Sequence, residues 1–279
     1  MTNKYKAGLI QLQSGINVDE NLKTAETLIS QAAEQGAKII FTPEMTPLLD
    51  RTPGRVEAQA SFEEDDGALK TFRTLAENLE VYIALGSAPI KAATGKLVNR
   101  SFIISPEGEI IASYDKIHMF DVDLPDGQHI RESEKYQAGC KPVVCKTDAG
   151  NIGLSICYDV RFPHLYRDLS LAGADLICVP SAFTAPTGKA HWHPLLRARA
   201  IETGAYVIAA AQGGKHQDGR ETYGHSLVVD PWGEIILEAD DKPTFGIFEY
   251  DLAKVENARR AIPNLANFKD YQKPELMNG

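Results

Sequence analysis

The first 45 residues alternate between strand and helix patterns, and this alternation restricts the fold more than any other feature of the chain. Residues 7–13 are apolar and have the pattern of a strand. Residues 19–35 then place apolar side chains on one face of a 3.6-residue period, and Gly36 supplies a helix stop. Residues 38–42 form a further short apolar strand. The order strand, helix, strand with short links predicts an α/β protein.

The same alternation continues to about residue 250. Helix patterns cover residues 69–79, 163–172 and 194–203. Apolar strand patterns lie between and after them, at residues 81–85, 98–104, 109–114, 152–156, 176–179, 206–210, 226–229, 234–237 and 245–250. Many strands with interspersed helices predict an α/β fold with mixed sheets.

A short pattern occurs twice, once in each half of the chain. Residues 104–111 and 229–236 each place a proline early and a glycine late between two apolar runs. Proline and glycine in these positions predict hairpin turns. Two such hairpins can indicate a pseudo-symmetric pair of packed sheets, or simply a common turn used twice, and the sequence leaves both interpretations open.

No stretch rich in serine, proline and glycine divides the chain of 279 residues. Single α/β domains commonly reach about 250 residues. We therefore expect one domain over residues 1–262 and a C-terminal tail at residues 263–279.

The charge balance and the cysteine count exclude several classes of protein. Acidic residues outnumber basic ones by 38 to 29, so we expect no nucleic-acid partner and no binding to anionic membranes. The longest apolar run, residues 205–211, is far shorter than the roughly 18 residues of a membrane-spanning helix. The N-terminus lacks a secretion-signal pattern and only four cysteines occur, so we expect a cytoplasmic protein without a disulfide framework.

Three residues with complementary chemistry each follow a predicted strand. Cys157 lies between the strand at 152–156 and the helix at 163–172, where α/β sheets place ligands and where backbone N–H groups favour a thiolate and an oxyanion. Glu44 follows the strand at 38–42, and Lys116 follows the strand at 109–114. Together they can act as nucleophile, base and charge stabiliser. Singly, each has a simpler interpretation: an inert buried cysteine and two solvated strand ends.

Three motifs around these residues resemble those of a known family. Phe-Thr-Pro-Glu44, Tyr-Asp-Lys116-Ile-His-Met-Phe-Asp-Val-Asp and Ile-Cys157-Tyr-Asp-Val-Arg-Phe-Pro resemble the motifs of the nitrilase (carbon–nitrogen hydrolase) superfamily, in the same order and at similar separations. The resemblance extends to about Pro263. It implies a four-layer αββα sandwich, no metal or organic cofactor, and a homodimer or larger even assembly that extends the sandwich to αββα-αββα.

The resemblance also implies roles for individual residues. Glu44 is expected to be the general base, Lys116 the oxyanion stabiliser and Cys157 the nucleophile that forms a thioester. Glu132 matches a second glutamate of the family, which positions the lysine. The backbone N–H of Tyr158 is expected to complete the oxyanion hole. Cleavage of a terminal carboxamide, with release of ammonia, follows from these roles.

Further segments resemble the Nit branch of the superfamily, which includes deaminated glutathione amidases and ω-amidases. They are Pro180-Ser-Ala-Phe183, Thr187-Gly188, Ala190-His-Trp192, Leu196-Arg-Ala-Arg-Ala-Ile-Glu202 and Tyr223-Gly-His-Ser226. This branch implies a small acidic amide as substrate, with deaminated glutathione favoured. The alternatives are an ω-amidase acting on α-ketoglutaramate-like acids, a nitrilase or carbamoylase, and a catalytically idle binding protein. His164 and His193 depart from the branch, which usually has glutamate at both positions.

The substrate pocket of the Nit branch implies three contacts. Arg161 is expected to bind a carboxylate of the substrate, and Phe183 and Thr187 are expected to line the same pocket. The alternative for Arg161 is an ion pair with Asp159 or Asp168.

Metal and nucleotide sites are disfavoured. His191 and His193 could bind zinc together, but Pro194 follows and the helix predicted there puts the two rings on different faces. The sequence contains no His-Glu-x-x-His, no Cys-x-x-Cys and no pair of glycines two apart. We therefore expect neither a metal nor a nucleotide cofactor.

Overall fold

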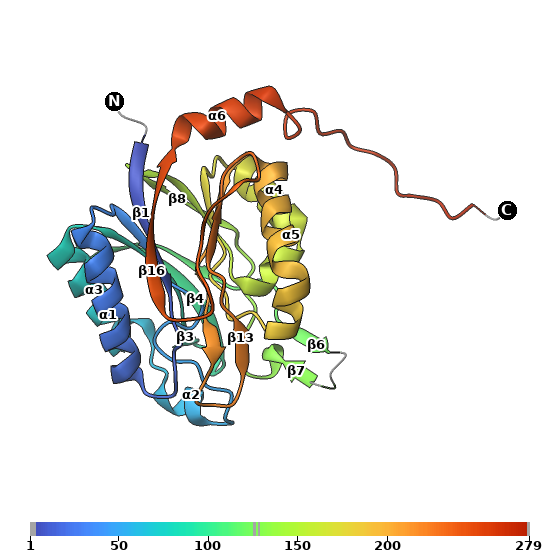
Figure 1. The fold of residues 1–279 in the computed structure, drawn as a ribbon. Helices are drawn as coiled ribbons and strands as arrows, with labels where there is room; N and C mark the ends of the chain where they lie inside the picture. The colour runs from blue at the N-terminus through green and yellow to red at the C-terminus, as the bar shows by residue number, and fades with distance from the viewer. Residues whose placement is uncertain (1–3, 125–126, 128, 278–279) are drawn as a thin grey trace.

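Two six-stranded sheets lie at the centre of the computed structural model, which describes residues 4–124, 127 and 129–277 (Figure 1). In the first sheet, β1, β2 and β3 are parallel to one another, while β4, β5 and β16 join antiparallel. Its strands, in spatial order, are β16 (Thr244–Asp251), β1 (Lys4–Gln11), β2 (Ile39–Phe41), β3 (Tyr82–Lys91), β4 (Leu97–Ile104) and β5 (Ile110–Asp115). The prediction of a mixed sheet is confirmed.

The second sheet repeats this pattern. Strands β9, β10 and β11 are parallel, while β14, β15 and β8 join antiparallel. Its strands, in spatial order, are β15 (Ile235–Glu238), β14 (Leu227–Val229), β11 (Tyr206–Ala209), β10 (Leu176–Cys178), β9 (Gly150–Leu154) and β8 (Val143–Thr147). The two Pro-x-Gly turns join β4 to β5 and β14 to β15, at equivalent places in the two sheets. The pseudo-symmetric interpretation of the repeated pattern is therefore confirmed.

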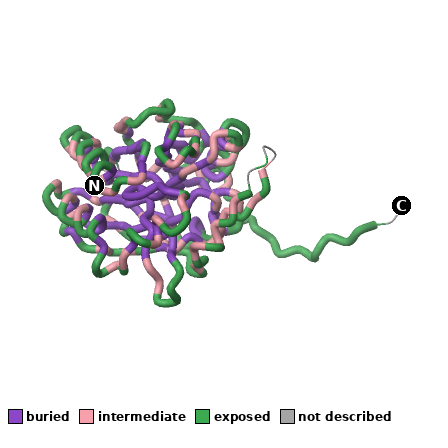
Figure 2. The backbone as a smooth tube through the Cα atoms, turned by 90° about the horizontal axis from the view of Figure 1, so that it is seen from below, coloured by how far each residue is buried: buried purple, intermediate pink, exposed green. Residues whose placement is uncertain are grey.

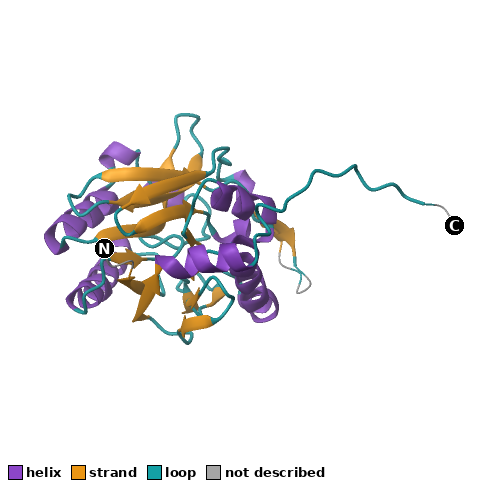
Figure 3. Ribbon diagram, turned by 90° about the horizontal axis from the view of Figure 1, so that it is seen from above, coloured by secondary structure: helices purple, strands orange, loops and turns teal. Residues whose placement is uncertain are grey.

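Helices cover the outer face of each sheet (Figures 1 and 3). α1 (Val18–Glu34) and α3 (Gly67–Leu79) pack on the first sheet, and α4 (Pro163–Leu171) and α5 (Ala185–Thr203) pack on the second. The helix starts are those that the sequence chemistry favours: the Asn17 side chain accepts from two N–H groups of α1, and Pro163 opens α4. The expected αββα sandwich is confirmed.

The inner faces of the two sheets pack directly on each other. Leu9 and Phe41 of the first sheet and Leu154, Cys178 and Ile208 of the second belong to one buried apolar cluster. Figure 2 shows the same result for the residues that the structure describes, with buried residues concentrated along the middle and exposed residues around them. This packing fixes the distance between the ends of strands that belong to different sheets.

The structure corrects the start of one helix. The helix expected at residues 194–203 begins at Ala185, so Pro194 lies inside α5. An internal proline costs roughly 3 kcal/mol because it removes a hydrogen bond and crowds the preceding turn. Burial of Trp192, Leu196 and Ala200 against the second sheet offsets that cost, and the Trp192 Nε1–H donates to the His225 carbonyl at 2.8 Å.

Several short elements were not predicted, because segments of three to five residues show no usable periodicity. They are α2 (Arg55–Gln59), the 3-10 turns η1 (Glu63–Asp65), η2 (Glu132–Glu134) and η3 (Cys157–Arg161), the hairpins β6 (Asp121–Asp123) with β7 (His129–Arg131) and β12 (Gly213–Lys215) with β13 (Glu221–Tyr223), and β8. The longer α6 (Leu252–Ala261) was missed as well, and only one of its residues, Val255, is buried.

Residues 262–277 leave the end of α6 and extend away from the sandwich (Figure 1). Along this segment, Phe268 lies against α4, with the Arg167 guanidinium 3.6 Å from its ring centroid. Among the described residues, every helix is too short or too polar to cross a membrane.

Candidate active site

Glu44 lies on a tight turn directly after β2. β3 approaches this turn so closely that a Cβ at Gly86 would lie 2.1 Å from the Thr42 carbonyl oxygen and 2.2 Å from that of Pro43. Only glycine fits such an approach. The neighbouring Met45 adopts a left-handed φ of 54°. Glu44 is 5% exposed, so the interpretation of this residue as a solvated strand end is wrong.

Lys116 follows β5, and its ammonium lies between two carboxylates. Nζ is 3.1 Å from Oε1 of Glu44, and 3.0 and 2.8 Å from Oε1 and Oε2 of Glu132. Burial disfavours the charged form, but the charges of Glu132 and Glu44 outweigh burial and raise the pKa of Lys116 well above its usual value. The lysine is therefore a permanent buried cation, and the solvated interpretation is wrong here too.

Cys157 is the first residue of η3, in the sharp turn between β9 and α4. Its φ of 48° lies in the left-handed region, and its N–H donates to the Pro180 carbonyl at 2.9 Å. A non-glycine residue held in this region is strained, and such strain concentrates at functional sites.

The surroundings of the Cys157 thiol favour its protonated form. Burial, followed by the negative charge of Glu44, raises the pKa of the thiol well above its usual value, although Lys116 opposes the shift. Glu44 is the carboxylate whose charge acts on the thiol, and it is therefore the natural acceptor for the thiol proton. The Ala182 backbone N–H favours the thiolate, as expected of backbone N–H groups, but burial and the charge of Glu44 outweigh it and the pKa of the thiol is raised.

Glu132 and Asn99 complete the network around Lys116. Glu132 begins η2, and its Oε2 accepts the Phe120 N–H at 2.7 Å. Asn99, in the middle of β4, places Nδ2 2.9 Å from Oε1 of Glu44 and 3.4 Å from Oε1 of Glu132. The four residues predicted to be catalytic, Glu44, Lys116, Glu132 and Cys157, thus lie in one connected cluster.

A second buried carboxylate links the lysine segment to the cysteine segment. Asp159, two residues after Cys157, accepts from the Tyr114 hydroxyl at 2.7 Å, the Ile156 N–H at 2.9 Å and the His118 N–H at 3.0 Å. It also lies 2.7 Å from His118 Nδ1. Tyr114 and His118 flank Lys116 in the sequence, so Asp159 ties the ends of β5 and β9 together.

Arg161, at the end of η3, lies among aromatic rings. Its guanidinium is 5.3 Å from the ring centroid of Phe183 and 5.9 Å from that of Tyr158, and both NH groups lie 3.3 Å from His191 Nδ1. Among the described residues no carboxylate pairs with it.

The alternative interpretation of Arg161, an ion pair with Asp159 or Asp168, is therefore wrong. Asp159 is occupied by Tyr114, Ile156 and His118, and Asp168 lies beside Arg167. Thr187 sits on the first turn of α5, where its hydroxyl hydrogen-bonds Thr184 at 2.6 Å, and no hydrogen bond between described residues joins it to Arg161.

His191 and His193 face different neighbours along α5. His191 contacts Arg161, whereas His193 Nε2 lies 2.8 Å from Oε1 of Glu238, which also contacts His225. Over residues 4–124, 127 and 129–277, no three histidine, cysteine or carboxylate side chains gather as a metal site would require.

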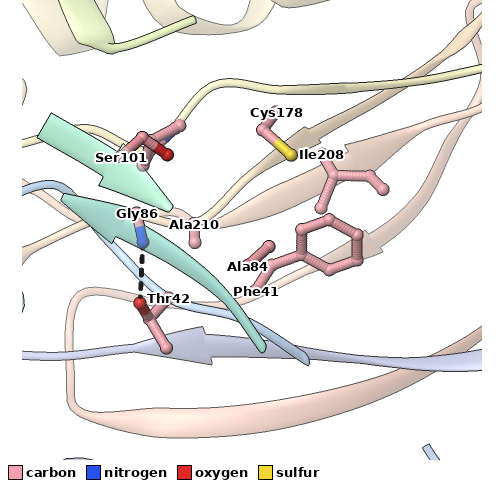
Figure 4. A pocket seen from close by; sticks show the side chains of 9 residues that line it. Phe41, Thr42, Ala84, Gly86, Ser101, Cys178, Ile208 and Ala210 are labelled. Carbon is pink, nitrogen blue, oxygen red and sulfur yellow. Dashed lines mark hydrogen bonds between the residues drawn. The ribbon is translucent and has the colours of Figure 1, made fainter. Parts of the chain in front are cut away.

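A cavity of about 10 Å³ lies behind the cluster, between the two sheets (Figure 4). Its wall is mainly apolar, and the Gly86 N–H donates to Thr42 Oγ1 at 3.0 Å beside it. It is lined by Phe41, Thr42, Ala84, Gly86, Ser101, Cys178, Pro180, Ile208 and Ala210. A space of this size holds about one water molecule, so it is a packing gap behind the site and not a substrate pocket.

Residues 6–260 match the carbon–nitrogen hydrolase family. Together with the αββα sandwich, this match defines the class of protein: the chain belongs to the carbon–nitrogen hydrolase family, and it is an enzyme of that class. A deaminated glutathione amidase of Synechocystis sp. is 43% identical over 265 residues, covering 94% of this chain and 97% of the relative.

Solved structures agree with this assignment. The C. elegans NitFhit protein superimposes with a TM-score of 0.89 at 34% identity, covering 96% of this chain and 66% of that longer one. An amidase from Nesterenkonia sp. AN1 superimposes with a TM-score of 0.77 at 27% identity, covering 92% of this chain and 94% of the other. That structure is a glutamate-to-glutamine mutant with the acetamide moiety of fluoroacetamide added covalently at the active-site cysteine.

The hydrogen bonds by which Asp159 links the ends of β5 and β9 lead to a prediction about stability, and we call this set of contacts the Asp159 clamp. Asp159→Asn removes a charge that accepts three or four hydrogen bonds, and it leaves buried donors without a partner. We expect the free energy of unfolding to fall by about 3 kcal/mol. Asp168→Asn, at a carboxylate whose side chain is 54% exposed, should change it by less than about 0.5 kcal/mol. Urea unfolding measures both, and equal effects would contradict the clamp.

Proposed function

We propose that the chain is an amidase that cleaves an amide of a small acidic substrate through a cysteine thioester, with deaminated glutathione as the favoured substrate. The observation that carries the proposal is the buried network in which Lys116 contacts Glu44 and Glu132, with the Cys157 thiol close enough for the charges of Glu44 and Lys116 to act on its pKa. The 43% identical relative of that name supports the choice of substrate.

In the first half of the proposed reaction, Glu44 accepts the thiol proton as Cys157 Sγ attacks the amide carbon. Negative charge then develops on the carbonyl oxygen. The Lys116 ammonium and the Tyr158 N–H, a donor in the first turn of η3 that the helix itself does not use, stabilise this charge. The protonated Glu44 then gives its proton to the departing nitrogen. The nitrogen leaves as ammonia from a primary amide, or as an amine from a secondary amide such as those of glutathione.

In the second half, water hydrolyses the thioester. Glu44, again unprotonated, takes a proton from the water, and the hydroxyl oxygen attacks the acyl carbon. Collapse of the second oxyanion breaks the carbon–sulfur bond, releases the acid and returns the proton to Cys157. Glu132 accepts from Lys116 and Phe120 throughout, so we assign it the positioning of the lysine.

The acidic substrate is supported by the surroundings of Arg161. Tyr158 and Phe183 present aromatic rings beside its guanidinium, and within the described chain no carboxylate neutralises it. A guanidinium in this situation keeps its planar set of N–H donors for a carboxylate of the substrate. We assign Phe183 and Thr187 to the walls of the same pocket.

A covalent intermediate on Cys157 is the first test. Wild type should acquire the acetamide mass from fluoroacetamide at Cys157, whereas Cys157→Ala should acquire none and should not hydrolyse amides. Glu44→Gln should lower turnover by roughly 10²–10⁴-fold, the usual contribution of acid–base catalysis. Intact-mass spectra with peptide mapping are the measurement. An adduct only on Cys140, Cys145 or Cys178 would contradict the assignment.

Substrate charge is the second test. Arg161→Met should weaken binding of acidic amides by roughly 2–5 kcal/mol, the usual cost of leaving a buried charge unpaired, and affect neutral amides much less. The measurement is kcat/KM for wild type and variant on deaminated glutathione, α-ketoglutaramate, N-carbamoyl-β-alanine and a neutral amide. Equal losses on all four would mean that Arg161 supports the fold and not the substrate.

We also propose a homodimer formed through α4 and α5, with the C-terminal tail at the interface. Large apolar side chains are exposed on this side of the molecule: Leu171, Ile201, Trp232 and Ile262. Ile201 and Trp232 are 50% and 57% exposed, and Ile201 lies against Gly233. A second copy would remove this apolar surface from water.

We further propose that the protein is located in the cytoplasm. Four unpaired cysteines, among them the nucleophile, suit a reducing compartment.

Light scattering tests the dimer. Wild type at micromolar concentration should have about twice the 30.6 kDa of one chain. Ile201→Glu should shift the mass toward the monomer, because it places a charge in the apolar interface. Ile111→Glu, at an exposed isoleucine on β5 of the other sheet, should leave the mass unchanged. A monomeric wild type would refute the dimer.

A further inference from the structure

Asn99 lies between the two carboxylates of the site, yet it comes from the interior of a strand. It stands in an otherwise apolar stretch of β4 and is 1% exposed. Its Nδ2 lies 2.9 Å from Oε1 of Glu44 and 3.4 Å from Oε1 of Glu132, and its backbone carbonyl accepts the Lys116 N–H at 2.9 Å. Asn99 therefore touches three of the four clustered residues.

The acceptors around it fix which way the amide faces. Both neighbouring oxygens belong to carboxylates, so the NH₂ group must point to them, since the amide oxygen would be repelled. Its Oδ1 is buried and has no hydrogen-bond partner among the described residues. An unsatisfied buried oxygen is costly and requires an explanation. The explanation is that the position retains an amide for its two N–H donors.

The charge balance explains why two donors are needed there. One ammonium faces two carboxylates, so the cluster carries excess negative charge in the interior. Neutral donors must stabilise that excess, and Asn99 can give one N–H to each carboxylate. The other titratable or charged groups that face the two carboxylates are Cys157 and Tyr136, with Glu57 and Arg220 around Tyr136.

We propose that Asn99 is a positioning residue that holds Glu44 and Glu132 together as ionised acceptors around Lys116. The proposal rests on the proposed function, in which Glu44 must be unprotonated to accept the thiol proton. Without Asn99 the two carboxylates lose shared donors, and the network takes up a proton at higher pH.

The test follows alkylation of Cys157 by fluoroacetamide, because this reaction needs no identified substrate. Carbon–sulfur bond formation releases fluoride and the thiol proton. We expect ionised Glu44 to accept that proton and so to accelerate labelling over the rate without a carboxylate acceptor. Labelling rates from intact mass are measured between about pH 5 and 9 for wild type and Asn99→Leu. We expect the acidic limb of the Asn99→Leu profile to move up by roughly one pH unit, and labelling near pH 7 to slow by about 10-fold.

A second variant should move the profile in the same direction by adding charge. Asn99→Asp has nearly the same shape but places a third carboxylate beside Glu44 and Glu132. Like charges disfavour ionisation, so the cluster should take up a proton at higher pH than in wild type. The acidic limb of the Asn99→Asp profile should therefore move up at least as far as that of Asn99→Leu. It also keeps the proposal testable where Asn99→Leu does not fold.

The matched control is Ser101→Ala, a buried residue two positions along the same strand, whose hydroxyl donates to the Leu85 carbonyl at 3.1 Å and touches neither carboxylate. It should keep the wild-type pH profile. Upward shifts of the acidic limb in both Asn99 variants would support the proposal. Unshifted profiles, or parallel losses at every pH like those of a destabilised control, would overturn it. Wild type that labels at Cys157 but hydrolyses no amide would instead count against the proposed function.

Discussion

The charge of one buried ammonium organises the site, because Lys116 holds Glu44 and Glu132 within 3.1 Å of its Nζ. The other hydrogen bonds of the site offset the charge imbalance of this arrangement. Two carboxylates around one cation leave excess negative charge, so further donors are required in the interior. The Ala182 N–H supplies one to Glu44 at 2.7 Å and the Phe120 N–H supplies one to Glu132. Each donor comes from a different segment, which means that the cluster can form only after the surrounding chain has folded.

The residues of the candidate site come from both sheets. Glu44 and Lys116 follow strands of the first sheet, whereas Cys157 and Ala182 follow strands β9 and β10 of the second. Because the sheets repeat the same strand order, the carboxyl ends of their parallel strands meet at one end of the sandwich. The apolar packing between the inner faces therefore sets the separation of Cys157 and Glu44, and a change in that core would alter it.

Sequence patterns could predict the elements with long periodic segments and the residues that end them. Glu44, Lys116 and Cys157 stood out because each follows an apolar run, and the three motifs resembled one family. Asn99 and Asp159 did not stand out, since their side-chain partners lie 33 to 55 residues away in the sequence and only the fold brings them near. The start of α5 was misplaced because Pro194 has the pattern of a helix boundary, and only the burial of Trp192 and Leu196 overrides it. The raised pKa of the Cys157 thiol depends on its burial, and the sequence does not reveal how deeply a cysteine is buried.

The burial of the Cys157 thiol has a consequence for how the protein withstands oxidants. Peroxides and disulfides react with thiolates, and reactivity falls steeply for a buried thiol that keeps its proton. Burial and the charge of Glu44 raise the pKa of the Cys157 thiol, while Cys140 is exposed to solvent. An oxidising episode should therefore consume the surface cysteine before Cys157. The burial that slows the reaction of this thiol with oxidants thus also preserves it.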